Sequence, residues 1–152
     1  MIEPRPFDAV MLATDLSATS SPAEEEAVRL AAGLGARLIA VSVIDLGTLR
    51  LPGGRYRARV DQVRREREVA AQALVRRARE AGVRTNFLVW EGDPGEAIVE
   101  AATAEQAGLI VLGSHGRRGV ERSLFGSVSD HVVRNAPCPV VVVRGTAAGS
   151  AA

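Results

Sequence analysis

The stretch LIVLGSHGRRGVERSLFGSVS, residues 109–129, places a short, wholly apolar run before a glycine-rich segment and a serine-rich helix start. The run Leu109–Leu112 has the composition of a strand that is buried on both faces of a sheet. Gly113 follows it directly, and a helix from Ser127 to about Asn135 is predicted to follow the glycine-rich segment. A buried strand, a loop and a helix in this order are typical of one unit of a parallel α/β sheet.

The same alternation of apolar runs and segments of helical period extends over the rest of the chain. The runs predict further strands at about Phe7–Ala13, Leu38–Ile44, Val83–Trp90 and Val140–Val143. The helical segments predict helices from Ser21 to near Gly33 or Gly35, over Ala58–Ala81, and from Asp93 to before Gly108. Between the second strand and its helix, Pro52–Gly54 predicts a long, mobile loop.

Two of these helices have matching start patterns, Ser21-Pro22-Ala23-Glu24 and Asp93-Pro94-Gly95-Glu96. Each pattern combines an N-cap residue, a proline in the first turn and a glutamate three residues after the cap. We therefore expect Ser21 and Asp93 to be N-caps and the two glutamates to complete capping boxes.

The polarity of the strands predicts their places in the sheet. The strand at 83–90 begins with polar residues, which suits a sheet edge, whereas Phe7–Ala13 and Leu109–Leu112 suit its centre. The simplest layout runs outward from the first strand to the third, and the chain then crosses back to place the fourth strand beside the first. Such a crossing is a topological switch point, where ligands bind outside the carboxyl ends of the strands. Here those ends are Thr14-Asp15 and Gly113-Ser114.

The residues after the fourth strand suit a phosphate group. Glycines allow positive φ and a close approach of the backbone, so Gly113, Gly116 and Gly126 can turn amide groups toward an anion. Ser127 and Ser129 lie at a helix start, where amide groups, hydroxyl groups and the helix dipole favour phosphate oxygen. Arginines in the intervening loop can screen a polyphosphate; these are Arg117, Arg118 and Arg122.

The composition excludes several other classes of protein. All 19 basic residues are arginine, and without lysine there is no GxxxxGK[ST] phosphate loop, Schiff-base enzyme or kinase-type lysine. Cys138 is the only cysteine, which excludes intrachain disulfides and paired-cysteine redox or zinc motifs. It is expected to be a small packed residue.

Charge argues against two kinds of partner. The formal net charge is +1, so no overall field draws the chain to nucleic acid or to a membrane surface. The arginines of the helix at 58–81 are interleaved with acidic residues and are expected to form a solvated face. No nucleic-acid partner and no membrane partner are expected. Because Glu3, Arg5 and Asp8 stand where a secretory signal would be apolar, a cytoplasmic location is expected.

Over nearly its whole length the sequence resembles the universal stress protein family, in its ATP-binding branch. The family motif G-x-x-G-(nine residues)-G-[ST] is met by Gly113, Gly116, Gly126 and Ser127. The family's apolar first strand ending in Thr-Asp is met at Thr14-Asp15. The clearest departure follows it, because the family's Asp-Gly-Ser is Asp15-Leu16-Ser17 here.

The resemblance implies a Rossmann-like α/β domain at residues 1–144, an open parallel sheet of order 3-2-1-4-5 with helices on both faces. The terminal residues 145–152 are expected to be a disordered tail. The resemblance also implies bound ATP accompanied by Mg or Mn, with no metal held by protein side chains alone. The implied nucleotide-binding residues are Ala13, Thr14, Asp15, Val43, Gly113, Ser114, His115, Gly116, Gly126, Ser127, Val128 and Ser129. Arg117 is added to this set as one of the loop arginines that can screen a polyphosphate. The last strand is apolar on both faces and lies at an edge. Together with the resemblance this predicts a homodimer paired through Val140, Val141, Val142 and Val143.

Three functions remain open from the sequence. The first is an ATP-binding, nucleotide-dependent regulator of the stress response with at most weak ATP hydrolysis and no assigned catalytic residue. The second is an ATPase or nucleotidyl-transferring enzyme that uses His115 and an arginine on the phosphates. The third is a module for an unknown protein partner, with a vestigial nucleotide pocket, that binds through the loop at 52–54 and the helix at 58–81.

Single residues also have plainer alternatives. The glycine motif alone is compatible with an ordinary strand-to-helix connection. Asp15 suits either a cap of its own loop or a ligand contact. His131 is expected to be a structural or surface residue, and Trp90 is expected to pack at a strand end.

Overall fold

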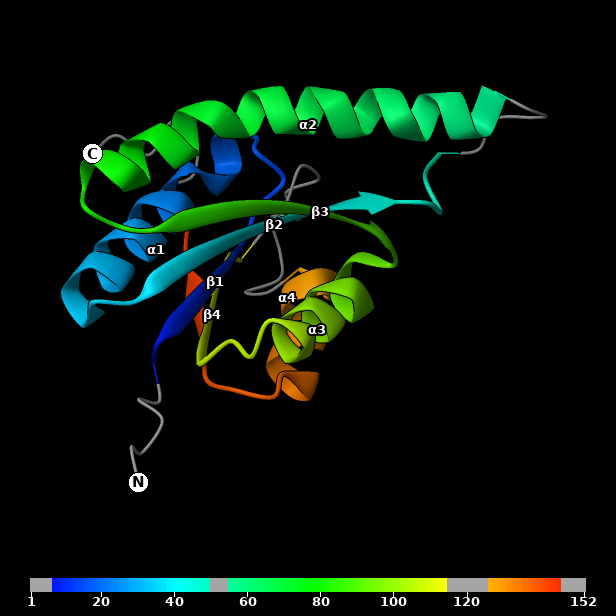
Figure 1. Ribbon diagram of the computed structural model, residues 1–152. Helices are drawn as coiled ribbons and strands as arrows, with labels where there is room; N and C mark the ends of the chain where they lie inside the picture. The colour runs from blue at the N-terminus through cyan, green and yellow to red at the C-terminus, as the bar shows by residue number, and fades with distance from the viewer. Residues whose placement is uncertain (1–6, 50–54, 115–125, 146–152) are drawn as a thin grey trace, which may run out of the picture.

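The computed structural model describes residues 7–49, 55–114 and 126–145 (Figure 1). In these ranges five parallel strands form one sheet in the order β3-β2-β1-β4-β5, as predicted. The strands are β1 (Ala9–Ala13), β2 (Arg37–Asp45), β3 (Thr85–Gly92), β4 (Leu109–Gly113) and β5 (Val140–Val143). The helices are η1 (Ala18–Ser20, a 3-10 helix), α1 (Ser21–Leu34), α2 (Arg55–Glu80), α3 (Pro94–Ala104) and α4 (Ser127–Asn135). No helix in the described ranges is both long and apolar enough to cross a membrane.

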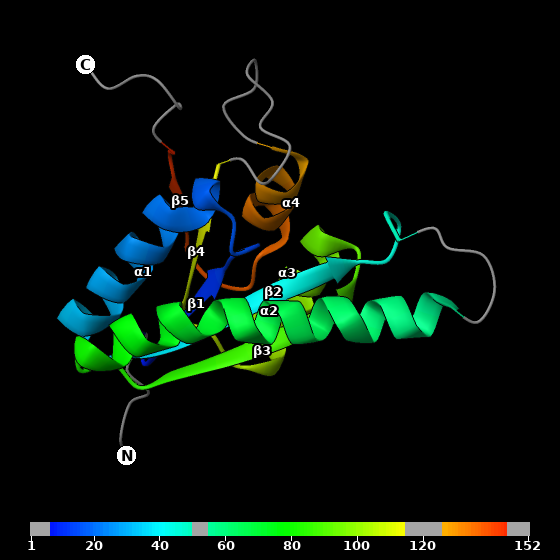
Figure 2. The same ribbon diagram turned by 90° about the horizontal axis from the view of Figure 1, so that it is seen from above.

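Helices cover both faces of the sheet because successive side chains of a buried strand point to opposite sides (Figure 2). Val10 and Leu12 of β1 belong to the cluster packed by α1 and α2, and Met11 belongs to the cluster packed by α3 and α4. All five residues of β1 are buried, which fits its place at the centre. The predicted edge position of β3 is confirmed by the strand order. The loop predicted at 52–54 lies outside the described residues.

Of the two predicted helix caps, one is confirmed and one is wrong. Asp93 is the N-cap of α3, where its side chain accepts a hydrogen bond from the Glu96 amide at 3.1 Å. The N-cap of α1 is Ser20 rather than Ser21, and it makes no side-chain cap bond. The preceding 3-10 helix changes the geometry of the start, and Glu24 does not complete a capping box but turns toward the end of β1.

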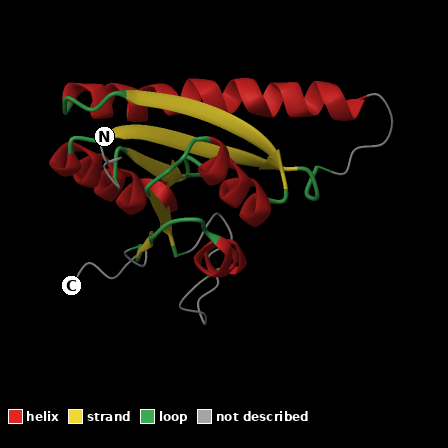
Figure 3. Cartoon of the chain, turned by 60° about the horizontal axis from the view of Figure 1, so that its bottom comes forward, coloured by secondary structure: helices red, strands yellow, loops and turns green. Residues whose placement is uncertain are grey.

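The arginines of α2 do more than form a solvated face. Figure 3 shows α2 lying along the β3 side of the sheet. Arg64 donates to the Val89 carbonyl at 3.1 Å and to the Glu91 carboxylate at 2.7 Å, and Arg79 donates to the Thr85 carbonyl at 3.4 Å. The guanidinium groups of α2 therefore contact the main chain of β3 directly.

These contacts fall on the outer side of β3. The Arg84 carbonyl accepts from the Leu38 amide of β2 at 2.8 Å. Because carbonyl directions alternate along a strand, the Thr85 and Val89 carbonyls point away from β2. Arg64 and Arg79 thus occupy acceptors that no neighbouring strand uses.

A close contact joins α3 to α4. A Cβ placed on Gly95 would lie 2.9 Å from the His131 ring and 3.0 Å from its Cβ. His131 is half-buried in α4, so its predicted structural role agrees with this packing. The absence of a side chain at Gly95 lets the two helices approach.

Replacing Gly95 by alanine is therefore expected to lower the free energy of unfolding by about 1–3 kcal/mol, because the helices must move apart. Gly33→Ala in α1 is the matched control. No atom lies within 4 Å of a Cβ there, so the helix should gain roughly 0.5–1 kcal/mol. Urea denaturation measures both changes, and equal stability of the two variants would contradict the close packing of α3 on α4.

Candidate functional site

The carboxyl ends of β1 and β4 meet the start of α4. Ala13 of β1 is paired in register with Leu112 of β4. The Ser114 carbonyl, just after β4, accepts from the Gly126 amide at 2.7 Å. This bond fixes the beginning of α4 beside the end of β4, at the switch point that the strand order creates (Figure 2).

The N-terminus of α4 has the features of an anion site. Its N-cap is Gly126, which has no side chain to cover the first amide groups, and Ser127 is exposed. The first amide groups of a helix have no partners within it and carry the positive end of the dipole. The acidic residue of the first turn, Asp130, forms an ion pair with Arg134 at 3.0 Å. This end of α4 therefore favours a negative group.

Gly126 does not use the positive φ that a glycine allows. Its φ is −71° and its ψ is 168°, an extended conformation that any residue adopts. The amide already donates to the Ser114 carbonyl, so it is not turned toward a ligand. Because glycine has no side chain, the backbone at Gly126 stays uncovered in front of the helix.

The two serines of α4 differ in their surroundings. The Ser129 hydroxyl is buried and lies within hydrogen-bond distance of two carbonyls, those of Ser114 at 3.2 Å and Gly126 at 3.0 Å. A hydroxyl has a single hydrogen, so both contacts draw on the same donor. Ser129 therefore fastens the start of α4 to the end of β4, whereas the exposed Ser127 faces solvent. Val128 is half-buried between them and packs on the α3/α4 cluster.

After β1 the chain enters a compact loop. The Asp15 carboxylate accepts from the Ser17 amide at 2.9 Å and from the Ser20 hydroxyl at 2.7 Å. These contacts show that Asp15 caps its own loop, while its predicted ligand contact stays a prediction. Ala13 and Thr14 are buried at the same end of the strand, and the Thr14 amide donates to Val41 of β2 at 3.0 Å.

Leu16, which stands at the departure from the family motif, adopts a left-handed conformation. Its φ is +63°, where a side chain costs roughly 1–2 kcal/mol and glycine costs nothing. Two contacts offset this cost. The Leu16 amide donates to the Thr14 hydroxyl at 2.9 Å, and the side chain packs against the α1/α2 cluster. The turn thus keeps the shape that a glycine would allow.

Val43 lies near the carboxyl end of β2, on the face covered by α3 and α4. Its partner in register is Trp90 of β3, which packs against the same cluster. Trp90 therefore lies at a strand end, as predicted. Val43 comes two positions after Val41, which pairs with the last residue of β1, so β2 extends past β1 toward the site.

Part of the predicted site lies outside the described residues: His115, Gly116 and Arg117, with Arg118 and Arg122. Among the residues that are described, no group of three or more His, Cys, Asp or Glu side chains is placed to hold a metal ion. Gly113 is half-buried at the end of β4, and Ser114 is buried next to it.

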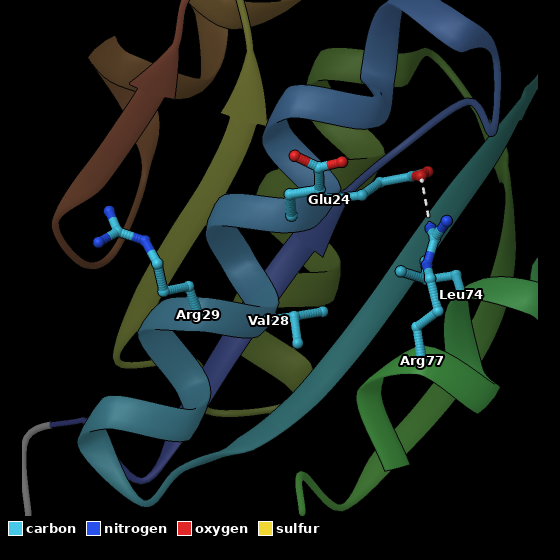
Figure 4. A pocket seen from close by; sticks show the side chains of 6 residues that line it. Glu24, Val28, Arg29, Leu74 and Arg77 are labelled. Atoms are coloured by element: carbon cyan, nitrogen blue, oxygen red, sulfur yellow. Dashed lines mark hydrogen bonds and ion pairs between the residues drawn. The ribbon is translucent and has the colours of Figure 1, made fainter. Parts of the chain in front are cut away.

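The described surface also has two hollows away from this site. One of about 230 Å³ lies between α1 and α2 and is lined by Glu24, Glu25, Val28, Arg29, Leu74 and Arg77 (Figure 4). The other, of about 560 Å³, lies along α2 beside Phe87 of β3. Glu24 at the first hollow is a residue whose surroundings the sequence did not reveal, since its spacing matched a capping box.

Cys138 is half-buried against the α3/α4 cluster, in agreement with its predicted packing role. Burial raises the pKa of its thiol. A raised pKa leaves less thiolate at a given pH, and the thiolate is the reactive form.

We therefore expect alkylation of Cys138 by iodoacetamide to rise at a higher pH in the folded protein than in the urea-unfolded chain. Coincident pH profiles would contradict the effect of burial.

Comparison with known proteins gives consistent matches. A profile of the universal stress protein family matches residues 6–144. The universal stress protein MJ0531 of Methanocaldococcus jannaschii is 34% identical over 140 residues, covering 91% of this chain and 82% of that protein. The structure of hypothetical protein MJ0577 superposes with a TM-score of 0.82 at 22% identity, covering 94% of this chain and 99% of that one. At that identity the likeness shows the fold alone.

Two similar structures were solved with nucleotides. A universal stress protein in complex with cAMP is 26% identical with a TM-score of 0.67, covering 92% of this chain and 98% of that one. The universal stress protein from Archaeoglobus fulgidus in complex with dAMP is 24% identical with a TM-score of 0.66, covering 91% of this chain and 99% of that one.

Proposed function

The chain belongs to the universal stress protein family, and on that premise we propose that it binds an adenine nucleotide, ATP, at the carboxyl ends of β1 and β4. The observation that carries the proposal is the start of α4. A glycine N-cap and an exposed Ser127 lie beside the switch point, held there by the 2.7 Å bond between Gly126 and Ser114. The relatives solved with cAMP and dAMP support an adenine nucleotide as the ligand.

In this proposal the phosphates lie at the start of α4 and the adenosine lies toward β1 and β2. Ser127 and the first amide groups of α4 bind phosphate oxygen, while Ser129 holds the helix in place. Ala13, Asp15 and Val43 border the adenosine. Mg or Mn accompanies the phosphates without a protein carboxylate cluster of its own. The contributions proposed for His115, Gly116 and Arg117 concern residues outside the described ranges.

We further propose that nucleotide occupancy regulates a stress response in the cytoplasm through a homodimer paired along β5. Residues 1–144 form the single domain of this proposal, and the tail at 145–152 lies outside it. We propose that any ATP hydrolysis is slow and incidental to this role.

The experiment begins with freshly purified protein. Denaturation followed by chromatography identifies any nucleotide that was carried through purification. Nucleotide-free protein is then titrated calorimetrically with ATP, ADP, AMP and GTP, with and without magnesium. We expect saturable binding of the adenine nucleotides and weaker binding of GTP. Absence of binding under all these conditions would overturn the proposal and leave the glycine motif as a structural connection.

A further inference from the structure

Glu24 carries the only charged side chain among the buried residues that the structure describes. It is 6% exposed and lies in α1, among the apolar residues that α1 packs onto the sheet. A carboxylate is costly to remove from water unless it is paired and hydrogen-bonded. Its partners therefore indicate what it does.

The two oxygens of Glu24 face different parts of the fold. Oε2 accepts from the Thr14 hydroxyl at 2.7 Å, and Oε1 lies 3.4 Å from the Arg77 guanidinium of α2 (Figure 4). The Thr14 contact is buried on both sides, whereas the Arg77 side chain is 57% exposed. Pairs with an exposed partner contribute little. The bond to Thr14 is therefore the stronger constraint.

Thr14 connects Glu24 to the loop after β1 through hydrogen bonds. Its one hydroxyl hydrogen is given to Glu24, and its oxygen accepts from the Leu16 amide at 2.9 Å. The hydroxyl therefore has no hydrogen left for a ligand. Instead, it holds Leu16 in a left-handed conformation that costs energy to maintain. Asp15, between the two, is directed by the same turn.

We propose that Glu24 is a positioning residue for nucleotide binding: through Thr14 it fixes the turn at residues 14–17 that borders the adenosine side of the site. This inference rests on the proposed function. The turn requires an acceptor for the Thr14 hydroxyl, and a neutral acceptor supplies it as well as a charged one does. Glu24 reaches the nucleotide only through the turn, and Thr14 contributes its main chain rather than its hydroxyl.

The test measures the dissociation constant for ATP by calorimetry and the melting temperature of each variant. Glu24→Leu and Thr14→Val are each expected to weaken binding about tenfold or more, because each breaks the same bond. The double variant should be no weaker than the single ones. Glu24→Gln keeps an acceptor oxygen and should restore binding to within about threefold of the original. Glu25→Leu, on the exposed neighbour in the same helix, is the matched control and should bind as the unchanged protein does.

A second measurement needs no nucleotide. Hydrogen exchange of the Leu16 and Ser17 amides should be about tenfold faster in Thr14→Val, while exchange in β2 stays unchanged. Thr14→Val preserves side-chain shape, so it serves where Glu24→Leu does not fold. A folded Glu24→Leu or Thr14→Val variant that binds ATP with unchanged affinity overturns the positioning role and leaves the proposed function intact. Failure of the unchanged protein to bind any adenine nucleotide overturns both, and the exchange rates still report whether the turn depends on Thr14.

Discussion

Replacing Ser127 by aspartate is expected to weaken ATP binding by at least about 100-fold while leaving the fold at least as stable as before. Ser127 is exposed at the first position of α4, where the proposed phosphates lie. Two like charges about 4 Å apart repel by roughly 4 kcal/mol near a protein surface, and each 1.4 kcal/mol is tenfold in affinity. The same carboxylate interacts favourably with the helix dipole and should add about 0.3–1 kcal/mol of stability. Loss of binding together with a retained fold is the expected result.

Ser127→Asn is the matched control for this variant. It has the size of aspartate without the charge, so it should lose at most about tenfold through one neutral hydrogen bond. Calorimetric titration with ATP measures binding, and thermal denaturation measures stability. If Ser127→Asp binds ATP as well as Ser127→Asn does, the phosphates do not lie at the start of α4.

Replacing Val142 by proline is expected to convert the proposed dimer into a monomer. The Pro139 and Val143 carbonyls accept from β4, from the Ile110 amide at 3.0 Å and the Ser114 amide at 2.9 Å. Because backbone directions alternate, the Val142 amide points away from β4, toward the edge where a second copy would pair. Proline removes that amide and is tolerated at the outer edge of a sheet. The ladder between β4 and β5 is therefore expected to survive.

Val142→Ala distinguishes the effect of losing the outward amide from the effect of changing the side chain. It shortens a side chain that packs on the α3/α4 cluster but keeps the outward amide, so this variant should remain a dimer. Light scattering at micromolar concentration gives the mass of each protein. A single-chain mass for the unchanged protein would contradict pairing through β5, as would a dimeric Val142→Pro variant.

The fold followed from local patterns in the sequence. Each residue's polarity indicates whether it is buried, and burial indicates which strands are central. The run Leu109–Leu112 is apolar throughout, whereas the strand at 83–90 begins with polar residues. The cap at Asp93 was also predictable, because its partner Glu96 is only three residues away. The position of the switch point, where the site is proposed, followed from the strand order, since a switch point is a property of topology.

What the sequence did not reveal depends on distant partners. Glu24 bonds to Thr14, ten residues earlier, and contacts Arg77, 53 residues later, so its local spacing suggested a capping box that tertiary contacts replace. Likewise, the bond between Ser129 and Ser114 spans 15 residues. The sequence alone does not show which serine at the start of α4 forms such a bond and which one is exposed. The negative φ of Gly126 could not be predicted either, because glycine is compatible with either sign of φ.

The two edges of the sheet are unlike, and this difference bears on how large the proposed assembly can become. Along β3, Arg64 and Arg79 of α2 occupy two outward carbonyls, whereas the part of the chain that the structure describes places no hydrogen bond on the outward main chain of β5. Two copies joined through β5 would form one continuous sheet that ends in β3 on both sides. At each end the Thr85 and Val89 carbonyls would already be occupied, which disfavours pairing with a third chain and favours a closed pair of copies over a fibre.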